Sequence, residues 1–164
     1  MKLMVVLSVA VIAIVVSGCA TTITAPVSGP TANLIVEVTN FAPERKLTNI
    51  ENVYFTLRNG DESWGGQQLI KNDKPSFSFS IPAQQELTYI LNLMQGGGGF
   101  SGTCGVQFDL TPPAGANLVT KFEFSRAGGS EVVGCKVGLY LDNKLVESYA
   151  GSAEITRYKV KLVY

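Results

Sequence analysis

From residue 33 onward, hydrophobic and polar positions alternate with a period of two. This spacing is typical of β-strands that bury one face. Asn59-Gly60 and Asp142-Asn143 supply turn residues between such runs, the second within a hairpin-like LYLDNKLVES. The pattern predicts an all-β domain over residues 33–164, a single antiparallel β-sandwich of about eight or nine strands. The apolar sets that share a face are Leu34, Val36 and Val38; Val53, Phe55 and Leu57; Phe77, Phe79 and Ile81; Val106, Phe108 and Leu110; Leu118, Phe122 and Phe124; Val133, Val137, Leu139 and Leu141; and Tyr158, Val160, Leu162 and Tyr164.

Residues 83–95 fit either a helix or a strand, because their apolar positions also lie on one helical face after Pro82. Pro82-Ala83-x-x-x-Leu87 recurs as Pro113-Ala114-x-x-x-Leu118, and the second copy contains glycine and asparagine, which are poor helix formers. We interpret both copies as corners that lead into strands. An apolar strand followed by such a corner and a further strand resembles transthyretin-like and immunoglobulin-like sandwiches, a resemblance of architecture that implies no function.

Residues 1–18 have the composition of a signal peptide. Met1-Lys2 precedes an apolar run from Leu3 to Val16 that only Ser8 interrupts, too short to cross about 30 Å of hydrocarbon comfortably as a helix. Val16-Ser17-Gly18-Cys19 follows and resembles the lipobox of bacterial lipoproteins. The resemblance implies that a signal peptidase recognises Val16, Ser17 and Gly18 and removes residues 1–18. It also implies that Cys19 carries a diacylglyceryl group.

The residues after Cys19 bear on location. Ala20, not aspartate, follows the cysteine, and in enteric-type lipoproteins this implies sorting to the outer membrane, here with the domain facing the periplasm. Residues 19–32 carry no charge and contain Pro26, Gly29 and Pro30. They are predicted to form a flexible tether that reaches at most about 40 Å. We therefore expect the membrane to be one partner, through the lipid anchor.

Composition narrows the function classes. Without residues 1–18 the chain keeps 12 basic and 13 acidic residues, a formal charge of −1 that argues against a nucleic-acid partner. The chain contains no histidine, which removes Ser-His-Asp and Cys-His catalysis and most zinc sites. Asp61 and Glu62 precede Trp64 in a loop, and Asp142 belongs to a turn, so these carboxylates are interpreted as solvated. We expect no enzyme activity, cofactor or metal.

Cys104 and Cys135 remain once Cys19 is assigned to lipid. An exported chain meets an oxidising compartment, where an even pair of cysteines is expected to form a disulfide. Cys104 is in phase with Val106 and Phe108, and Cys135 is in phase with Val133 and Val137. Both sulfur atoms are therefore predicted to point into the core. The chain has no Cys-x-x-Cys motif, so we interpret the bridge as structural.

Three features are candidates for binding. Trp64 is the only tryptophan; it can bind sugars or partners from its loop, although an indole folded back over the sandwich is the commoner arrangement. Gly96–Gly99, together with Phe100, Ser101 and Gly102, contains a literal G-x-G-x-x-G from Gly97. A strand follows it, so a hairpin loop with Phe100 at its tip is favoured over a dinucleotide site. Arg157, Lys159 and Lys161 alternate on the last strand, and a solvated edge is favoured there over contact with anionic phosphates.

These observations predict a membrane-anchored envelope lipoprotein with a non-enzymatic binding or assembly role in an envelope protein complex. A strand edge or the glycine loop would form the contact. The alternative is carbohydrate or peptidoglycan binding through Trp64 and adjacent loops.

Overall fold

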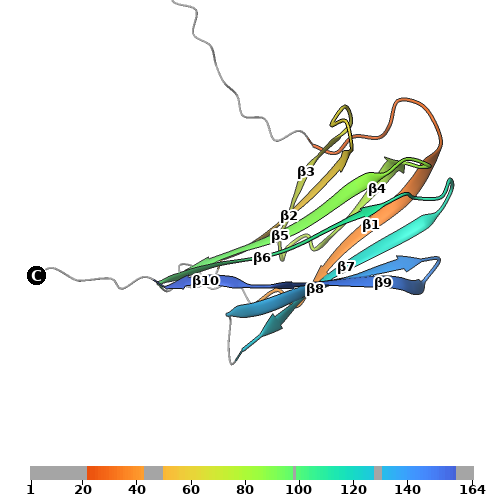
Figure 1. Cartoon of the computed structure of the whole chain (residues 1–164). Helices are drawn as coiled ribbons and strands as arrows, with labels where there is room; N and C mark the ends of the chain where they lie inside the picture. Colours follow the sequence, from red (N-terminus) through yellow and green to blue (C-terminus); the bar gives the residue numbers. More distant parts are fainter. Residues whose placement is uncertain (1–21, 43–49, 98, 128–130, 158–164) are drawn as a thin grey trace, which may run out of the picture.

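Two five-stranded β-sheets pack face to face in the computed structural model (Figure 1), which describes residues 22–42, 50–97, 99–127 and 131–157. The strand orders are β4-β1-β7-β8-β9 and β10-β6-β5-β2-β3. We call these sheet 1 and sheet 2. The predicted all-β sandwich is confirmed. The strands are β1 (Thr31–Thr39), β2 (Ile50–Asn59), β3 (Gly65–Ile70), β4 (Ser76–Pro82), β5 (Leu87–Gly97), β6 (Phe100–Leu110), β7 (Asn117–Arg126), β8 (Val132–Leu141), β9 (Lys144–Ser152) and β10 (Glu154–Arg157).

The core lies between the sheets and is built from the alternating apolar positions of both. Phe55 and Tyr89 from sheet 2 and Phe122 from sheet 1 are among its largest fully buried side chains. Cys104 on β6 and Cys135 on β8 form a disulfide that joins the two sheets, as the phase of both residues predicts. Among the described residues, no helix is long and apolar enough to cross a membrane.

The described strands number ten rather than eight or nine, and one pair differs in direction from the prediction. β3 was not predicted because its sequence, Gly65-Gly66-Gln67-Gln68, has no apolar alternation. β1 and β7 run parallel, while every other named pair is antiparallel. Alternation along one strand reports which face is buried, and it contains no information about the direction of a neighbour.

Leu87–Gly97 is a strand, so the strand interpretation of residues 83–95 is confirmed from Leu87 on. The Pro-Ala corners lead into β5 and β7 and touch one another, since the Gln84 N–H donates to the Pro112 carbonyl at 2.8 Å. Asp142 and Asn143 both adopt positive φ and connect β8 to β9 by the predicted hairpin turn. The predicted strand set from Tyr158 to Tyr164 lies outside the described residues.

Val133 does not face the core as its alternation with Val137 predicts. The β7–β8 register pairs Ser125 with Gly134 and then Arg126 with Val132, which leaves Val133 without an opposite residue. This β-bulge shifts the alternation by one position. Val132 is therefore 3% exposed and Val133 is 44% exposed.

The predicted tether, residues 19–32, is part of the domain from Ile23 on. β1 begins at Thr31, two residues before the predicted boundary, and Ile23 is 7% exposed within the core cluster. The Ala83 N–H donates to the Pro30 carbonyl and the Gly115 N–H donates to the Thr31 carbonyl, so both Pro-Ala corners bind this segment. A proline-rich stretch without periodicity can still be ordered when neighbouring backbone N–H groups donate hydrogen bonds to its carbonyl oxygens.

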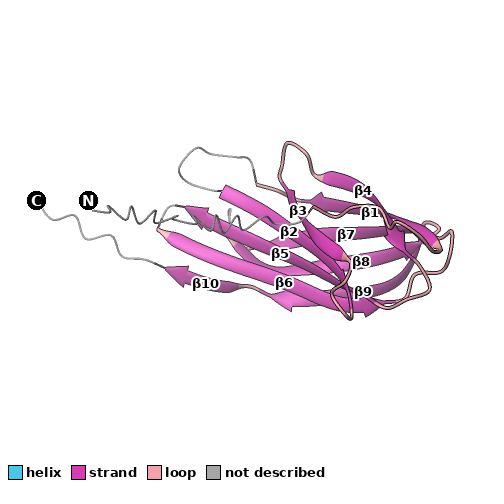
Figure 2. Ribbon diagram, turned by 90° about the horizontal axis from the view of Figure 1, so that it is seen from above, coloured by secondary structure: helices cyan, strands magenta, loops and turns pink. Residues whose placement is uncertain are grey.

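The two ends of the sandwich carry different connections. The β1 start, the β2–β3, β4–β5 and β6–β7 connections and the β8–β9 turn share one end, which we call the proximal end. The β5–β6 hairpin and β10 lie at the opposite, distal end (Figure 1). Figure 2 shows β3, β2, β5, β6 and β10 side by side across sheet 2.

β9 changes from sheet 1 to sheet 2 by continuing into β10, and this crossing requires glycine at position 151. A Cβ there would overlap the backbone carbonyl oxygen of Gly105 on β6. Gly151→Ala is therefore expected to destabilise the domain by about 1–3 kcal/mol, because one backbone must move. Chemical denaturation measures the effect. Gly96→Ala is the matched control, since its Cβ would meet nothing within 4 Å; equal stability of the two variants would contradict the close approach.

Candidate functional site

The outer face of sheet 1 carries opposite charges that pair with one another. Lys121 Nζ lies 3.6 Å from a carboxylate oxygen of Glu37, and Lys136 Nζ lies 2.9 Å from one of Glu123. The Lys121 ammonium also sits 5.1 Å from the centroid of the Tyr140 ring. Such paired, water-exposed charges are typical of a solvated face.

The outer face of sheet 2 differs because its central positions are uncharged. In the strand register Tyr54 lies between Leu69 and Asn92, with Gly105 beyond Asn92. Met94 is among the exposed large hydrophobic residues. Arg58 and Asp109 flank this area at the proximal end and Glu154 flanks it on β10. We call the uncharged area the neutral face; it comprises Asn52, Tyr54, Thr56, Gln67, Leu69, Ile90, Asn92, Met94, Thr103, Gly105 and Gln107.

A shallow hollow of about 310 Å³ lies in the neutral face. Its lining combines hydrogen-bonding groups with apolar surface. Gln67 Nε2 donates to Thr56 Oγ1 at 3.1 Å, whereas the Tyr54 hydroxyl and the Asn92 amide have no hydrogen-bond partner in the described part of the chain. We call this feature the Tyr54 hollow; it is lined by Tyr54, Thr56, Gln67, Ile90, Asn92 and Met94.

A buried ion pair joins the sheets near the distal end. Arg126 on β7 donates from both terminal nitrogens to the Glu51 carboxylate on β2, at 2.7 and 2.9 Å. The Glu51 side chain is 3% exposed and that of Arg126 is 18% exposed. Gln95 on β5 donates to Glu51 at 2.7 Å, and the Ala42 N–H donates to it at 2.9 Å. No local sequence pattern indicates this cluster, because 75 residues separate Arg126 from Glu51.

The surroundings of Glu51 determine its ionisation. Burial of the carboxylate raises its pKa, but the hydrogen bonds from Arg126 and Ala42, the charge of Arg126 and the hydrogen bond from Gln95 lower it by more. The net effect is a pKa below the ordinary value. Glu51 is thus ionised at neutral pH and occupied by structural partners, which does not suit a general acid.

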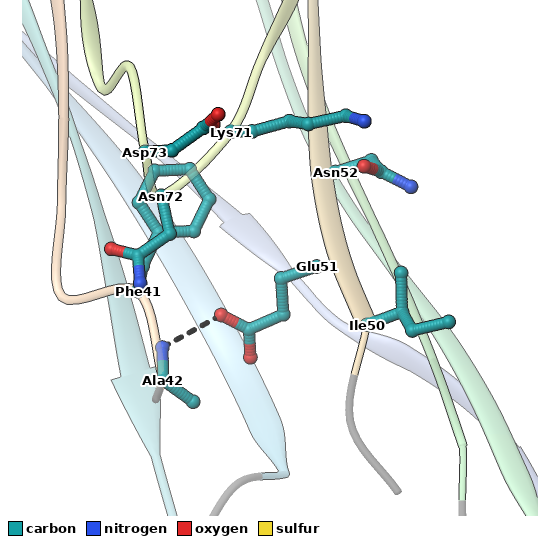
Figure 3. Close-up of a pocket in the computed structure, with 8 residues that line it drawn as sticks. All are labelled: Phe41, Ala42, Ile50, Glu51, Asn52, Lys71, Asn72 and Asp73. Carbon is teal, nitrogen blue, oxygen red and sulfur yellow. Dashed lines mark hydrogen bonds between the residues drawn. The ribbon is translucent and has the colours of Figure 1, made fainter. Parts of the chain in front are cut away.

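A second hollow, of about 270 Å³, lies beside this ion pair (Figure 3). Figure 3 shows Glu51 at its centre, accepting the hydrogen bond from Ala42, while Lys71 and Asp73 come from the β3–β4 turn. Among the described residues, Arg126, Gln95 and Ala42 already bind the carboxylate, so Glu51 is engaged in protein contacts at this hollow. The residues around this hollow are Phe41, Ala42, Ile50, Glu51, Asn52, Lys71, Asn72 and Asp73.

Trp64 packs against the core, and its Nε1 is buried without a hydrogen-bond partner among the described residues. This geometry corresponds to an indole that caps the sandwich and does not favour a sugar platform.

Asp61 accepts a hydrogen bond from the Ser63 N–H at 3.0 Å, and hydrogen bonds from Ser63 lower its pKa. Glu62 pairs with Arg58. Both acidic side chains are exposed, and their contacts stay within the β2–β3 connection and the adjacent end of β2.

Phe100 begins β6, opposite Gly97 of β5 and Arg157 of β10, and it is partly exposed. The Gly96–Gly99 segment belongs to the β5–β6 hairpin, as predicted, although Gly98 lies outside the described residues. Arg157 pairs with Glu131 at 2.7 and 2.9 Å. The other two predicted basic residues, Lys159 and Lys161, lie outside the described part, and so do Val16, Ser17, Gly18 and Cys19.

Within the described ranges, no three His, Cys, Asp or Glu side chains come close enough to hold a metal ion. Comparison with protein families, curated proteins and solved structures finds no match for this chain. The neutral face was not predicted, although the sequence carries a signal for it, because its residues form one surface only where β3, β2, β5 and β6 pair. Its signal is the run of uncharged outward residues on adjacent strands, at 52–56, 90–94 and 103–107.

Proposed function

We propose that this protein is a membrane-anchored bacterial envelope lipoprotein with a non-enzymatic binding role, and that the neutral face is its contact surface. The observation that carries the proposal is the contrast between the two outer faces. Sheet 1 presents paired charges, while sheet 2 presents Tyr54, Ile90 and Met94 among uncharged polar groups. Depletion of charge around aromatic and methionine side chains is typical of the centre of a binding surface.

The buried position of Ile23 supports a role close to the membrane. With the lipid on Cys19, only residues 20–22 separate the anchor from a side chain in the core. Four residue steps span at most about 14 Å, so the domain is held close to the outer membrane, on its periplasmic side in this proposal. This reach is shorter than that of a fully flexible segment 19–32.

Photocrosslinking in intact cells tests the contact surface. A photoreactive residue at position 94, on the neutral face, is expected to give specific adducts that survive purification. The same residue at position 136, on the outer face of sheet 1, is the matched control, because loss of an exposed ion pair has little effect on stability. Equal adducts at both positions, or none at position 94, would contradict the neutral face.

Cys19→Ala tests the anchor in the same cells. The variant is expected to leave the membrane fraction or to stay unprocessed, because only a thiol can form the thioether to lipid. Its adducts at position 94 are expected to decrease, since the domain is no longer held at the membrane. Fractionation identical to that of the wild type would refute the lipoprotein assignment.

A further inference from the structure

We infer that the Tyr54 hollow binds an uncharged carbohydrate chain. This inference rests on the proposed function and names the ligand class for the same face. The inferred carbohydrate site lies in the middle of sheet 2, whereas the sequence suggested the proximal loop that carries Trp64. The distinction is physical, because the Trp64 indole packs against the core and the hollow is open to solvent.

The chemistry of the lining matches the two surfaces of a sugar ring. A sugar presents C–H groups that pack on apolar side chains and hydroxyl groups that donate and accept hydrogen bonds. Tyr54, Ile90 and Met94 provide the apolar contact. Asn92 and Gln67 provide amides, and each amide has both donors and an acceptor. The Asn92 amide and the Tyr54 hydroxyl have no hydrogen-bond partner in the described part of the chain, so they can bind a ligand without breaking a protein contact.

Charge excludes several other ligand classes. The six residues that line the hollow include no acidic or basic side chain. Phosphate, sulfate and carboxylate groups are recognised by arginine, lysine or helix N-termini, which the lining lacks. An uncharged ligand with many hydroxyl groups fits this set, whereas an anionic polysaccharide does not.

The size of the neutral face favours a narrow ligand over a folded protein. Four strands about 4.8 Å apart span roughly 15–19 Å, and positions 52–56 or 90–94 with their neighbours extend roughly 15–20 Å along the strands. The resulting area, roughly 200–400 Å², is below the roughly 800 Å² per partner of a stable protein interface. A carbohydrate chain lying in the hollow needs no larger area.

Isothermal titration calorimetry with the full mature lipoprotein tests this inference. The protein is kept in a zwitterionic detergent without a sugar head group, and the probes are neutral hexasaccharides of glucose, N-acetylglucosamine, mannose and galactose. An oligogalacturonate is the anionic comparison. At least one neutral probe is expected to bind with a Kd of about 10⁻⁵ to 10⁻³ M, and the oligogalacturonate is expected to bind at least about tenfold more weakly.

Substitutions then locate the binding. Tyr54→Ala and Asn92→Leu are each expected to weaken binding about tenfold, since Tyr54→Ala removes the aromatic ring from the hollow and Asn92→Leu removes its amide. Tyr54→Phe keeps the ring and is expected to weaken it by less than about threefold to fivefold. Tyr140→Ala, on the outer face of sheet 1, is expected to leave the Kd unchanged. Thermal denaturation of each variant shows that the fold is retained.

Each outcome separates this inference from the proposed function. No binding by any neutral probe, with specific adducts still formed at position 94, would overturn the carbohydrate ligand and leave the neutral face as a contact surface. Stronger binding of oligogalacturonate than of every neutral probe would also overturn it. Binding that survives Tyr54→Ala and Asn92→Leu would remove the Tyr54 hollow as the site. No binding together with no adducts would overturn both proposals.

Discussion

Replacing both Cys104 and Cys135 with alanine is expected to lower the free energy of unfolding by about 3–4 kcal/mol. The disulfide links residues that are 31 positions apart and joins sheet 2 to sheet 1. Without it the unfolded chain gains the freedom that closure of this loop removes, and chain-entropy arguments give about 3.7 kcal/mol for this length. Native stability of a domain is commonly only 5–15 kcal/mol, so this loss is a large part of the total.

Urea denaturation of the oxidised wild type and the double variant measures the loss. The wild type treated with a reductant is the matched control, because it loses the bond and keeps both sulfur atoms. Reduced wild type and the double variant are expected to unfold at similar urea concentrations, both well below the oxidised protein. A double variant as stable as the oxidised wild type would show that the packed sheets alone determine the stability.

Breaking the ion pair between Arg126 and Glu51 is expected to cost about 3–5 kcal/mol of stability. Arg126→Met leaves the Glu51 carboxylate buried without its guanidinium, and a buried charge that loses its partner is costly. Removing both charges together, in Glu51→Gln with Arg126→Met, is expected to cost less than Arg126→Met alone. Lys136→Met breaks an exposed pair and is the control, with an expected effect below about 1 kcal/mol.

The pH dependence distinguishes this charge effect from lost packing. Burial raises the pKa of Glu51, but the hydrogen bonds and charge of Arg126, with Ala42 and Gln95, hold it below its ordinary value of 4.5. The carboxylate therefore stabilises the fold above the pKa it has in the unfolded chain. That contribution is lost as the pH falls through the lowered folded pKa. Urea denaturation at neutral and acidic pH is expected to show a smaller acid-induced loss in Glu51→Gln than in the wild type. An equal loss in both would contradict the role of Glu51.

Much of the fold follows from local pattern. Period-two alternation predicted most strands, since a strand that buries one face must place apolar residues at every second position. The pair of cysteines that remains after Cys19 predicted a disulfide, the phase of Cys104 and Cys135 predicted its position in the core, and this bridge is present. Asp142-Asn143 predicted a hairpin because these residues tolerate the positive φ that its turn requires. A strand that begins at Leu87 was favoured over a helix only because the Pro-Ala segment before it resembles the second Pro-Ala segment, whose glycine and asparagine are poor helix formers.

The candidate site was less accessible from the sequence. The predicted binding residues were Trp64, the only tryptophan, in a loop, and Phe100, the large apolar residue at the tip of the glycine hairpin. Trp64 turns onto the core, which is the arrangement that the sequence already favoured over a sugar-binding one. The neutral face was overlooked because each uncharged polar residue in it is unremarkable alone. It becomes a surface only where β3, β2, β5 and β6 lie in register.

The sequence by itself determined the β class, most strand positions and the pairing of Cys104 with Cys135. Each of these depends on residue type or on spacing along one strand. Tertiary structure alone decided the parallel β1–β7 pair, the bulge at Val133, the buried position of Ile23 and the Glu51–Arg126 ion pair. These features arise between segments far apart in the chain, where packing and backbone hydrogen bonding select the partner, and local periodicity contains no record of that choice.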